Sequence, residues 1–134
     1  MASDAFEQGL RPNGLRQMRA LIAHADELQA LIAESKKIAP ALSVDDVLHA
    51  LVKVTKLNFF DLQAIFNAID NLNVLKDEYG SSDKAIDGTA LAIGKDQLPG
   101  LDEKREQIRA AIDAYSGDNP IAISLKARRL SYHL

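Results

Sequence analysis

The sequence predicts an all-α fold, a single-domain bundle of five to six helices with an irregular N-terminal arm. Apolar residues recur every three or four positions along most of the 134 residues, which places them on one face of a helix. Aromatic residues make up only 5% of the chain and Trp is absent, so Leu, Ile, Val and Ala must supply most of the core. Such a core suits helices better than a β-sandwich. We therefore expect a flexible arm over residues 1–13, where Gly9 and Pro12 disfavour a helix, and a helical bundle domain over residues 14–134.

The first two predicted helices lie on either side of a proline. A long helix over residues 15–37 is indicated by a set of apolar residues at helical spacing: Met18, Leu21, Ala25, Leu28 and Ile32. Pro40 ends this helix, because the residue before a proline avoids helical geometry. Ser43, followed three residues later by Asp46, comes close to a capping box and begins a second helix that ends near Thr55.

The clearest helix covers residues 59–79. Asn58 is a suitable N-terminal cap, and Gly80 is a suitable stop. The apolar residues of this segment step by three or four and predict one buried face: Leu62, Ile65, Phe66, Ile69 and Leu72.

Two more helices follow before the C-terminal segment. A shorter helix capped by Ser81 or Ser82 runs to about residue 93, although Gly88 weakens it. After a loop over residues 94–100, a fifth helix covers residues 101–115, with these residues at helical spacing: Leu101, Arg105, Ile108, Ile112 and Tyr115.

The C-terminal segment is open to two interpretations. Asn119 and Pro120 are typical of a helix cap and first helical position. Ile121, Ile123 and Leu125 alternate as in a strand, whereas the residues around them are good helix formers. We favour a helix over residues 121–134, because the chain offers no second convincing strand for pairing.

Composition narrows the function classes. The chain has no Cys, which removes disulfides, thiolate nucleophiles, iron–sulfur clusters and cysteine zinc sites. The net charge is −3, and a nucleic-acid-binding protein usually carries a basic field. Asp4 and Glu7 occupy the N-terminus without a basic residue before them, and no run approaches the length of a membrane span. We expect a cytoplasmic protein with no membrane segment.

Motifs for cofactors, metals and covalent catalysis are missing from the sequence. It contains neither a Walker pattern, nor G-x-G-x-x-G, nor H-E-x-x-H, nor the G-x-S-x-G of serine hydrolases. A calcium loop beginning at Asp83 would need a bidentate Glu where Gly94 stands. Asp45 and His49, four residues apart, are better interpreted as a surface hydrogen bond than as metal ligands. We therefore predict no cofactor, no metal site and no catalytic residue.

Two Arg–His pairs are the remaining catalytic signal. Arg19 and His24, like Arg128 and His133, are separated by four residues. This spacing resembles the short signature of the HEPN class of all-helical ribonucleases. The resemblance implies that Arg and His act at a scissile phosphate, which agrees with the chemistry of both side chains. It covers six residues.

Two clusters are candidate partner-binding residues. Phe59 and Phe60 cannot both enter one core stripe, because adjacent helical residues point about 100° apart. We interpret the extra ring as a hydrophobic staple that packs back on its own helix, with an exposed partner contact as the alternative. The second cluster is basic and resembles a solvated helix end, with an acidic or phosphate partner as its alternative: Lys126, Arg128 and Arg129.

The function expected from these features is a non-enzymatic helical protein–protein interaction or assembly module. Its partner is a protein or a second copy of the chain, and nucleic acid is not expected. Two alternatives stay open: a HEPN-like nucleic-acid-cleaving enzyme that uses the Arg–His pairs, and a bundle that binds a small apolar ligand.

Overall fold

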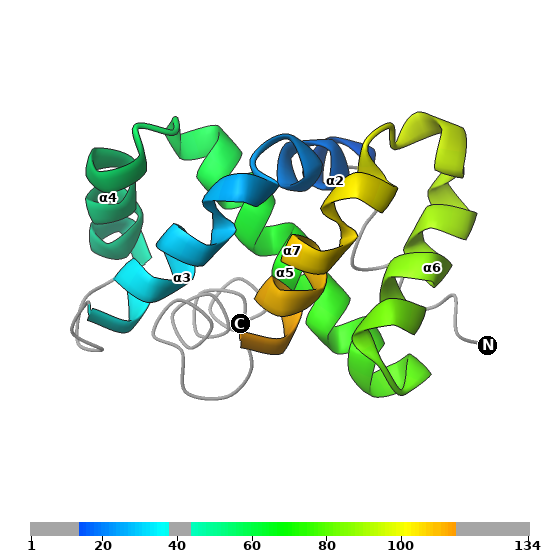
Figure 1. Cartoon of the computed structure of the whole chain (residues 1–134). Helices are drawn as coiled ribbons and strands as arrows, with labels where there is room; N and C mark the ends of the chain where they lie inside the picture. Colours follow the sequence, from blue (N-terminus) through cyan, green and yellow to red (C-terminus); the bar gives the residue numbers. More distant parts are fainter. Residues whose placement is uncertain (1–13, 38–43, 115–134) are drawn as a thin grey trace, which may run out of the picture.

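A computed structural model describes residues 14–37 and 44–114, which are helical and contain no strand (Figure 1). This confirms the predicted all-α fold. The elements in chain order are α2 (Gly14–Ala23), the 3₁₀ segment η1 (Ala25–Glu27), α3 (Leu28–Lys37), α4 (Val44–Thr55), α5 (Phe59–Tyr79), α6 (Ser82–Ile93), the 3₁₀ segment η2 (Lys95–Gln97) and α7 (Leu101–Ala114). The predicted arm over residues 1–13 and the tail over residues 121–134 lie outside the described residues.

Helix α5 is the central element of the bundle. The Asn58 side chain accepts a 2.7 Å hydrogen bond from the Asp61 backbone N–H, which caps the first turn. Gly80 ends the helix in the left-handed region, with φ of 97°, and its N–H donates to the Lys76 carbonyl. Between these caps α5 packs against α2, α4, α6 and α7, so its buried residues cover more than one stripe. The cap and stop predicted from the sequence are both confirmed.

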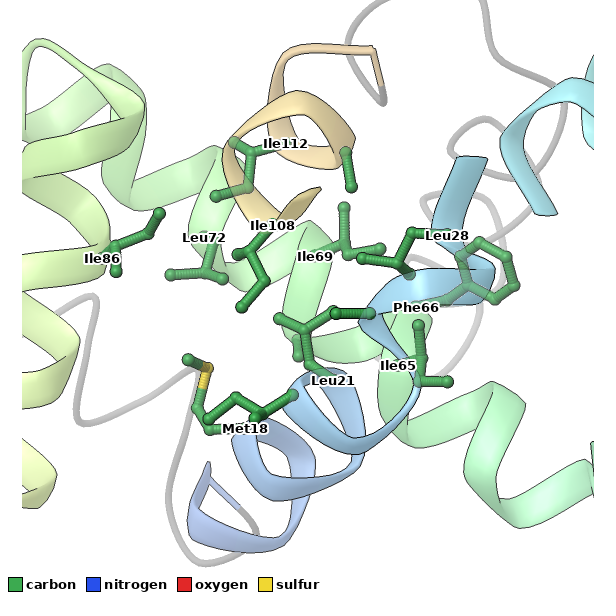
Figure 2. Close-up of a cluster of buried hydrophobic side chains, with 14 of the residues drawn as sticks. Met18, Leu21, Leu28, Ile65, Phe66, Ile69, Leu72, Ile86, Ile108 and Ile112 are labelled. Carbon is green, nitrogen blue, oxygen red and sulfur yellow. The ribbon is translucent and has the colours of Figure 1, made fainter. Parts of the chain in front are cut away.

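The five residues predicted as the buried face of α5 are all in the core. Each is at most 1% exposed, and Phe66 is among the largest fully buried side chains. Figure 2 shows Ile69 and Leu72 meeting Leu21 of α2 and Ile108 of α7 between the helices. Among the described residues, the core is thus mainly aliphatic, as composition predicted. Phe66 is its buried aromatic ring, and Phe59 and Tyr79 pack against its edge.

The first predicted helix is wrong in one respect: it is not continuous. α2 ends at Ala23, His24 leaves helical geometry with φ of −112° and ψ of 20°, and η1 turns the chain before α3 begins at Leu28. The apolar spacing does not show this break, because Leu21, Ala25 and Leu28 are all buried across it. The physical reason is a change of partners, since α2 packs mainly on α5 whereas α3 packs on α4 and α7.

Helix α6 begins and ends as predicted. Ser81 caps it by accepting a 3.1 Å hydrogen bond from the Lys84 N–H, and Ile86 is fully buried. Gly88 is explained by packing, because a Cβ at this position would lie 2.7 Å from Cε2 of Tyr79. Glycine lowers the helix propensity at this position, but it leaves the space that the Tyr79 ring occupies.

Helix α7 differs from its predicted face at one position. Leu101, Ile108 and Ile112 are buried as predicted, whereas Arg105 is not a core residue. Its guanidinium lies 2.6 Å from Asp87 Oδ1 and 3.6 Å from Asp83 Oδ1, both on α6. Helical spacing alone places Arg105 on the apolar face of α7. In the structure its charge is paired with Asp83 and Asp87 at the edge of the α6–α7 contact.

A polar cluster fastens the end of α7 to α5 and α6. The buried Ser82 hydroxyl donates a 2.5 Å hydrogen bond to Asp113 Oδ1, and Lys76 Nζ lies 3.2 Å from the same oxygen. Asn73 donates from its side-chain amide to the Ile112 carbonyl at 3.0 Å. The Ser82 hydrogen bond, followed by the Lys76 interactions, lowers the pKa of Asp113 below its ordinary value of 3.8.

The lowered pKa of Asp113 predicts a stability contribution that depends on acidity. Because the folded pKa lies below the unfolded one, the carboxylate stabilises the fold above pH 3.8, and this stabilisation is lost as pH falls through the folded pKa. Asp113→Asn is expected to cost about 1 kcal/mol at neutral pH, since the side chain is partly exposed, and much less in acid. Urea unfolding at several pH values measures the difference, and Ser82→Ala should shrink it. A difference between wild type and Asp113→Asn that stays constant down to strong acid would contradict the assignment.

Candidate protein-interaction surface

An apolar groove lies between α3 and α7, which run side by side in Figure 1. Its volume is about 460 Å³. Leu28, Ile32 and Ala111 form a buried floor, while Ala33 and Ala110 are exposed at its edges. The complete lining is Leu28, Gln29, Ile32, Ala33, Gln107, Ala110, Ala111 and Ala114. Aliphatic side chains thus cover nearly all of the groove, and Gln29 and Gln107 supply its polar lining.

The groove exists because α7 presents short side chains toward α3. Ala110, Ala111 and Ala114 lie one turn apart or adjacent, so they share the side of α7 opposite the Asp87–Arg105 contact. Methyl groups leave open space where a leucine or isoleucine would fill the gap between the two helices. The result is an open channel above a closed core.

One end of the groove is held by charged and amide side chains. Lys104 Nζ lies 2.8 Å from both carboxylate oxygens of Asp26, and Gln107 donates to Asp26 Oδ1 at 2.7 Å. These bonds join η1 to α7 and fix the spacing of the two walls. They also occupy the amide of Gln107, so this lining residue is already engaged within the protein.

The two adjacent phenylalanines have different environments. Phe59 is half-buried, packs against the core and lies 5.8 Å from the His49 ring, centroid to centroid. Phe60 is 68% exposed. The interpretation of the extra ring as a staple on its own helix is therefore wrong for Phe60, because the preceding helix α4 and the core receive Phe59 and leave its neighbour in solvent. The role of both residues in partner binding stays a prediction.

The basic cluster and one Arg–His pair fall outside the described residues. Lys126, Arg128 and Arg129 belong to the segment after Ala114, as does His133. Partner binding by the basic cluster stays a prediction, and action of Arg128 and His133 at a phosphate stays the alternative.

Arg19 and His24 line a second depression of about 410 Å³ beside α2, together with Asp61 and apolar residues such as Leu15. Arg19 is directed to the loop before α7, where it donates to the Gln97 carbonyl at 3.1 Å and to its side chain at 3.2 Å. His24 lies 3.6 Å from a carboxylate oxygen of Glu27 and, through its other nitrogen, 3.6 Å from one of Asp61. Two carboxylates beside the imidazole oppose the approach of a phosphate. This geometry suits a histidine that holds the bend between α2 and α3.

The described residues form neither a metal-binding cluster nor a membrane-spanning helix. Within residues 14–37 and 44–114, no three His, Asp or Glu side chains gather closely enough to hold a metal ion. None of the helices in that part of the chain combines the length and apolar character needed to cross a bilayer.

Sequence reasoning missed the groove altogether. The available signal was the run of alanines at the end of α7, adjacent to the core residues Ile108 and Ile112. Alanine favours helices and fits a core as well as a surface, so this signal does not distinguish a groove from ordinary packing. The partner wall, Leu28 to Ala33, lies nearly eighty residues earlier in the sequence.

The chain matches no family model, no curated protein and no solved structure.

Proposed function

We propose that this chain is a non-enzymatic helical protein–protein interaction module, which binds the apolar face of a partner helix in the groove between α3 and α7. The observation that carries the proposal is the aliphatic groove of about 460 Å³, floored by Leu28, Ile32 and Ala111. A groove between two helices is a common receptor for an amphipathic helix, whose apolar residues enter at helical spacing.

The lining favours a protein partner over a small ligand. Small-molecule sites orient their ligand with a few convergent polar groups, whereas this lining offers two glutamines, one of which is bonded to Asp26. The nuclease alternative lacks comparable support, because the carboxylates of Glu27 and Asp61 flank His24. An apolar helix face needs only shape and aliphatic contact, which the groove provides.

Photo-cross-linking followed by titration tests the proposal. Because the chain has no Cys, Ala110→Cys carries a single benzophenone in the groove, and Leu91→Cys carries one on the exposed face of α6 as the control. In extract of the source cells, a protein that cross-links only through position 110 is expected. Capture alone does not decide the matter, so the captured protein is then purified and titrated.

The purified partner is expected to lose roughly tenfold or more in affinity for Ala110→Arg, because a guanidinium is placed in an apolar contact. The matched variant Leu91→Arg, whose parent residue is 85% exposed, should bind like wild type. Phe60→Ala in the same titration tests the predicted contribution of that exposed ring. Equal affinity for the two arginine variants would overturn the groove as the binding site.

A further inference from the structure

We propose that the helix bound in the α3–α7 groove is basic on its flank, with Lys or Arg side chains that meet the carboxylates of Glu103 and Glu106 on α7. The inference rests on the proposed function, because it takes the groove to be a helix-binding site, and it adds the chemical class of the partner. It starts from the two sides of the groove, which differ in charge.

The α7 side of the groove carries two exposed carboxylates. Glu106 lies one turn before the lining residue Ala110, and Glu103 lies one turn before Gln107 and two turns before Ala110. This spacing places both carboxylates on the side of α7 that borders the groove. Glu103 and Glu106 are both exposed and form the acidic edge of the groove, so a helix bound there passes beside them.

The α3 side of the groove is uncharged from Leu28 to Ala33. Gln29, Ala30 and Ala33 are the exposed residues of this stretch, and their side chains are neutral. A partner helix therefore meets carboxylates along one edge and neutral side chains along the other. Along this stretch, the preference for a charge on the partner comes from α7.

The basic side chains of α7 already have acidic partners. These ion pairs are Lys104–Asp26, Arg105–Asp87 and Arg109–Glu106. Glu103 has no ion pair among the described residues. The Glu106 side chain stays 78% exposed beside Arg109, and a carboxylate has about four acceptor sites, so Glu106 can receive a second cation. The acidic edge thus offers acceptors to a basic partner, and α7 presents no unpaired base to repel it.

The dipole of α7 accounts for only part of this acidic edge. Asp102 and Glu103 lie in the first turn of the helix, where carboxylates stabilise the N-terminus. Glu106 lies in the second turn, where the effect of the dipole has fallen off. Glu106 therefore extends the acidic edge along the groove beyond the start of the helix.

The exposure of the acidic edge determines which rate it changes. Charges at the rim of an interface change the association rate and its salt dependence more than the affinity, because water and salt screen them. The apolar contacts of the groove then set the dissociation rate. We therefore expect a helix with basic flanks to associate about threefold faster or more at low salt than one with acidic flanks, with a similar dissociation rate.

Two synthetic helical peptides test the inference on the full chain. They share one stripe of Leu and Ala at helical spacing and differ only on its two flanks, which carry Lys in one peptide and Glu in the other. Stopped-flow anisotropy of a fluorescein label gives the association and dissociation rates. The Lys peptide is expected to associate faster, and about 0.5 M salt should remove most of the difference, because the Debye length is then only a few ångströms.

Matched double variants separate the acidic edge from the overall charge of the protein. Glu103→Gln with Glu106→Gln removes two carboxylates beside the groove, and Asp77→Asn with Glu78→Gln removes two exposed ones from the last turn of α5. The first double variant should abolish the rate advantage of the Lys peptide, and the second should keep most of it. Equal losses in the two double variants, or equal association of both peptides with wild type, would overturn the inference.

Ala110→Arg distinguishes failure of the inference from failure of the proposed function. If the two peptides associate equally with wild type and both lose affinity for Ala110→Arg, the groove binds helices regardless of their charge, and only the inference fails. If neither peptide binds, or if Ala110→Arg binds both like wild type, the proposed function fails together with the inference.

Discussion

Replacement of Phe66 by alanine is expected to lower the free energy of unfolding by about 3–5 kcal/mol. Phe66 is 1% exposed, and it lies on α5, which four other helices contact. Removal of the ring leaves a cavity that no single helix can fill without losing its contacts on another side. The loss is a large fraction of the stability of a typical domain. Urea denaturation followed by far-ultraviolet circular dichroism measures it.

Phe60 on the same helix provides the matched control. Its side chain is 68% exposed, so Phe60→Ala should change the free energy of unfolding by no more than about 0.5 kcal/mol. Similar losses for Phe66→Ala and Phe60→Ala would mean that the buried face of α5 is misplaced.

The second large effect is expected at Ile86 on α6. Ile86 is fully buried and contributes to the core beside Leu72 (Figure 2), so Ile86→Ala should cost about 2–5 kcal/mol. Leu91, five residues later on the same helix, is 85% exposed. Leu91→Ala shortens an exposed side chain of the same size as Ile86. It should change the free energy of unfolding by no more than about 0.5 kcal/mol. The difference between the two variants, measured by urea denaturation, tests which face of α6 packs on α5. If Leu91→Ala were as unstable as Ile86→Ala, the assignment of the buried face of α6 would be wrong.

Local sequence signals predicted the helices whose ends are fixed by local chemistry. Asn58 and Gly80 bound α5 because a side-chain oxygen and a left-handed residue satisfy backbone groups within a few residues of the same helix. Ser81 acts in the same way at the start of α6. The periodicity of α5 predicted its core face because that helix contributes buried residues from Leu62 to Leu75.

Local sequence signals could not predict the features that depend on contacts between distant segments of the chain. The bend at His24 follows from a change of packing partner, and the same apolar repeat continues through it. The choice between Phe59 and Phe60 depends on His49 from the preceding helix. The groove requires Ile32 and Ala110 to come together across the fold, which no spacing within either helix expresses.

The bend between α2 and α3 also affects how the groove can respond to an occupant. A continuous helix would transmit any tilt of its C-terminal half to its N-terminal half, which is packed on α5. Here the α-helical hydrogen-bond ladder is interrupted at His24, and the tight bond from the Glu27 N–H to the His24 carbonyl replaces it. The orientation of the Leu28 wall is therefore set by the contacts of α3 with α4 and α7, independently of the packing of Leu21 and Met18 in α2.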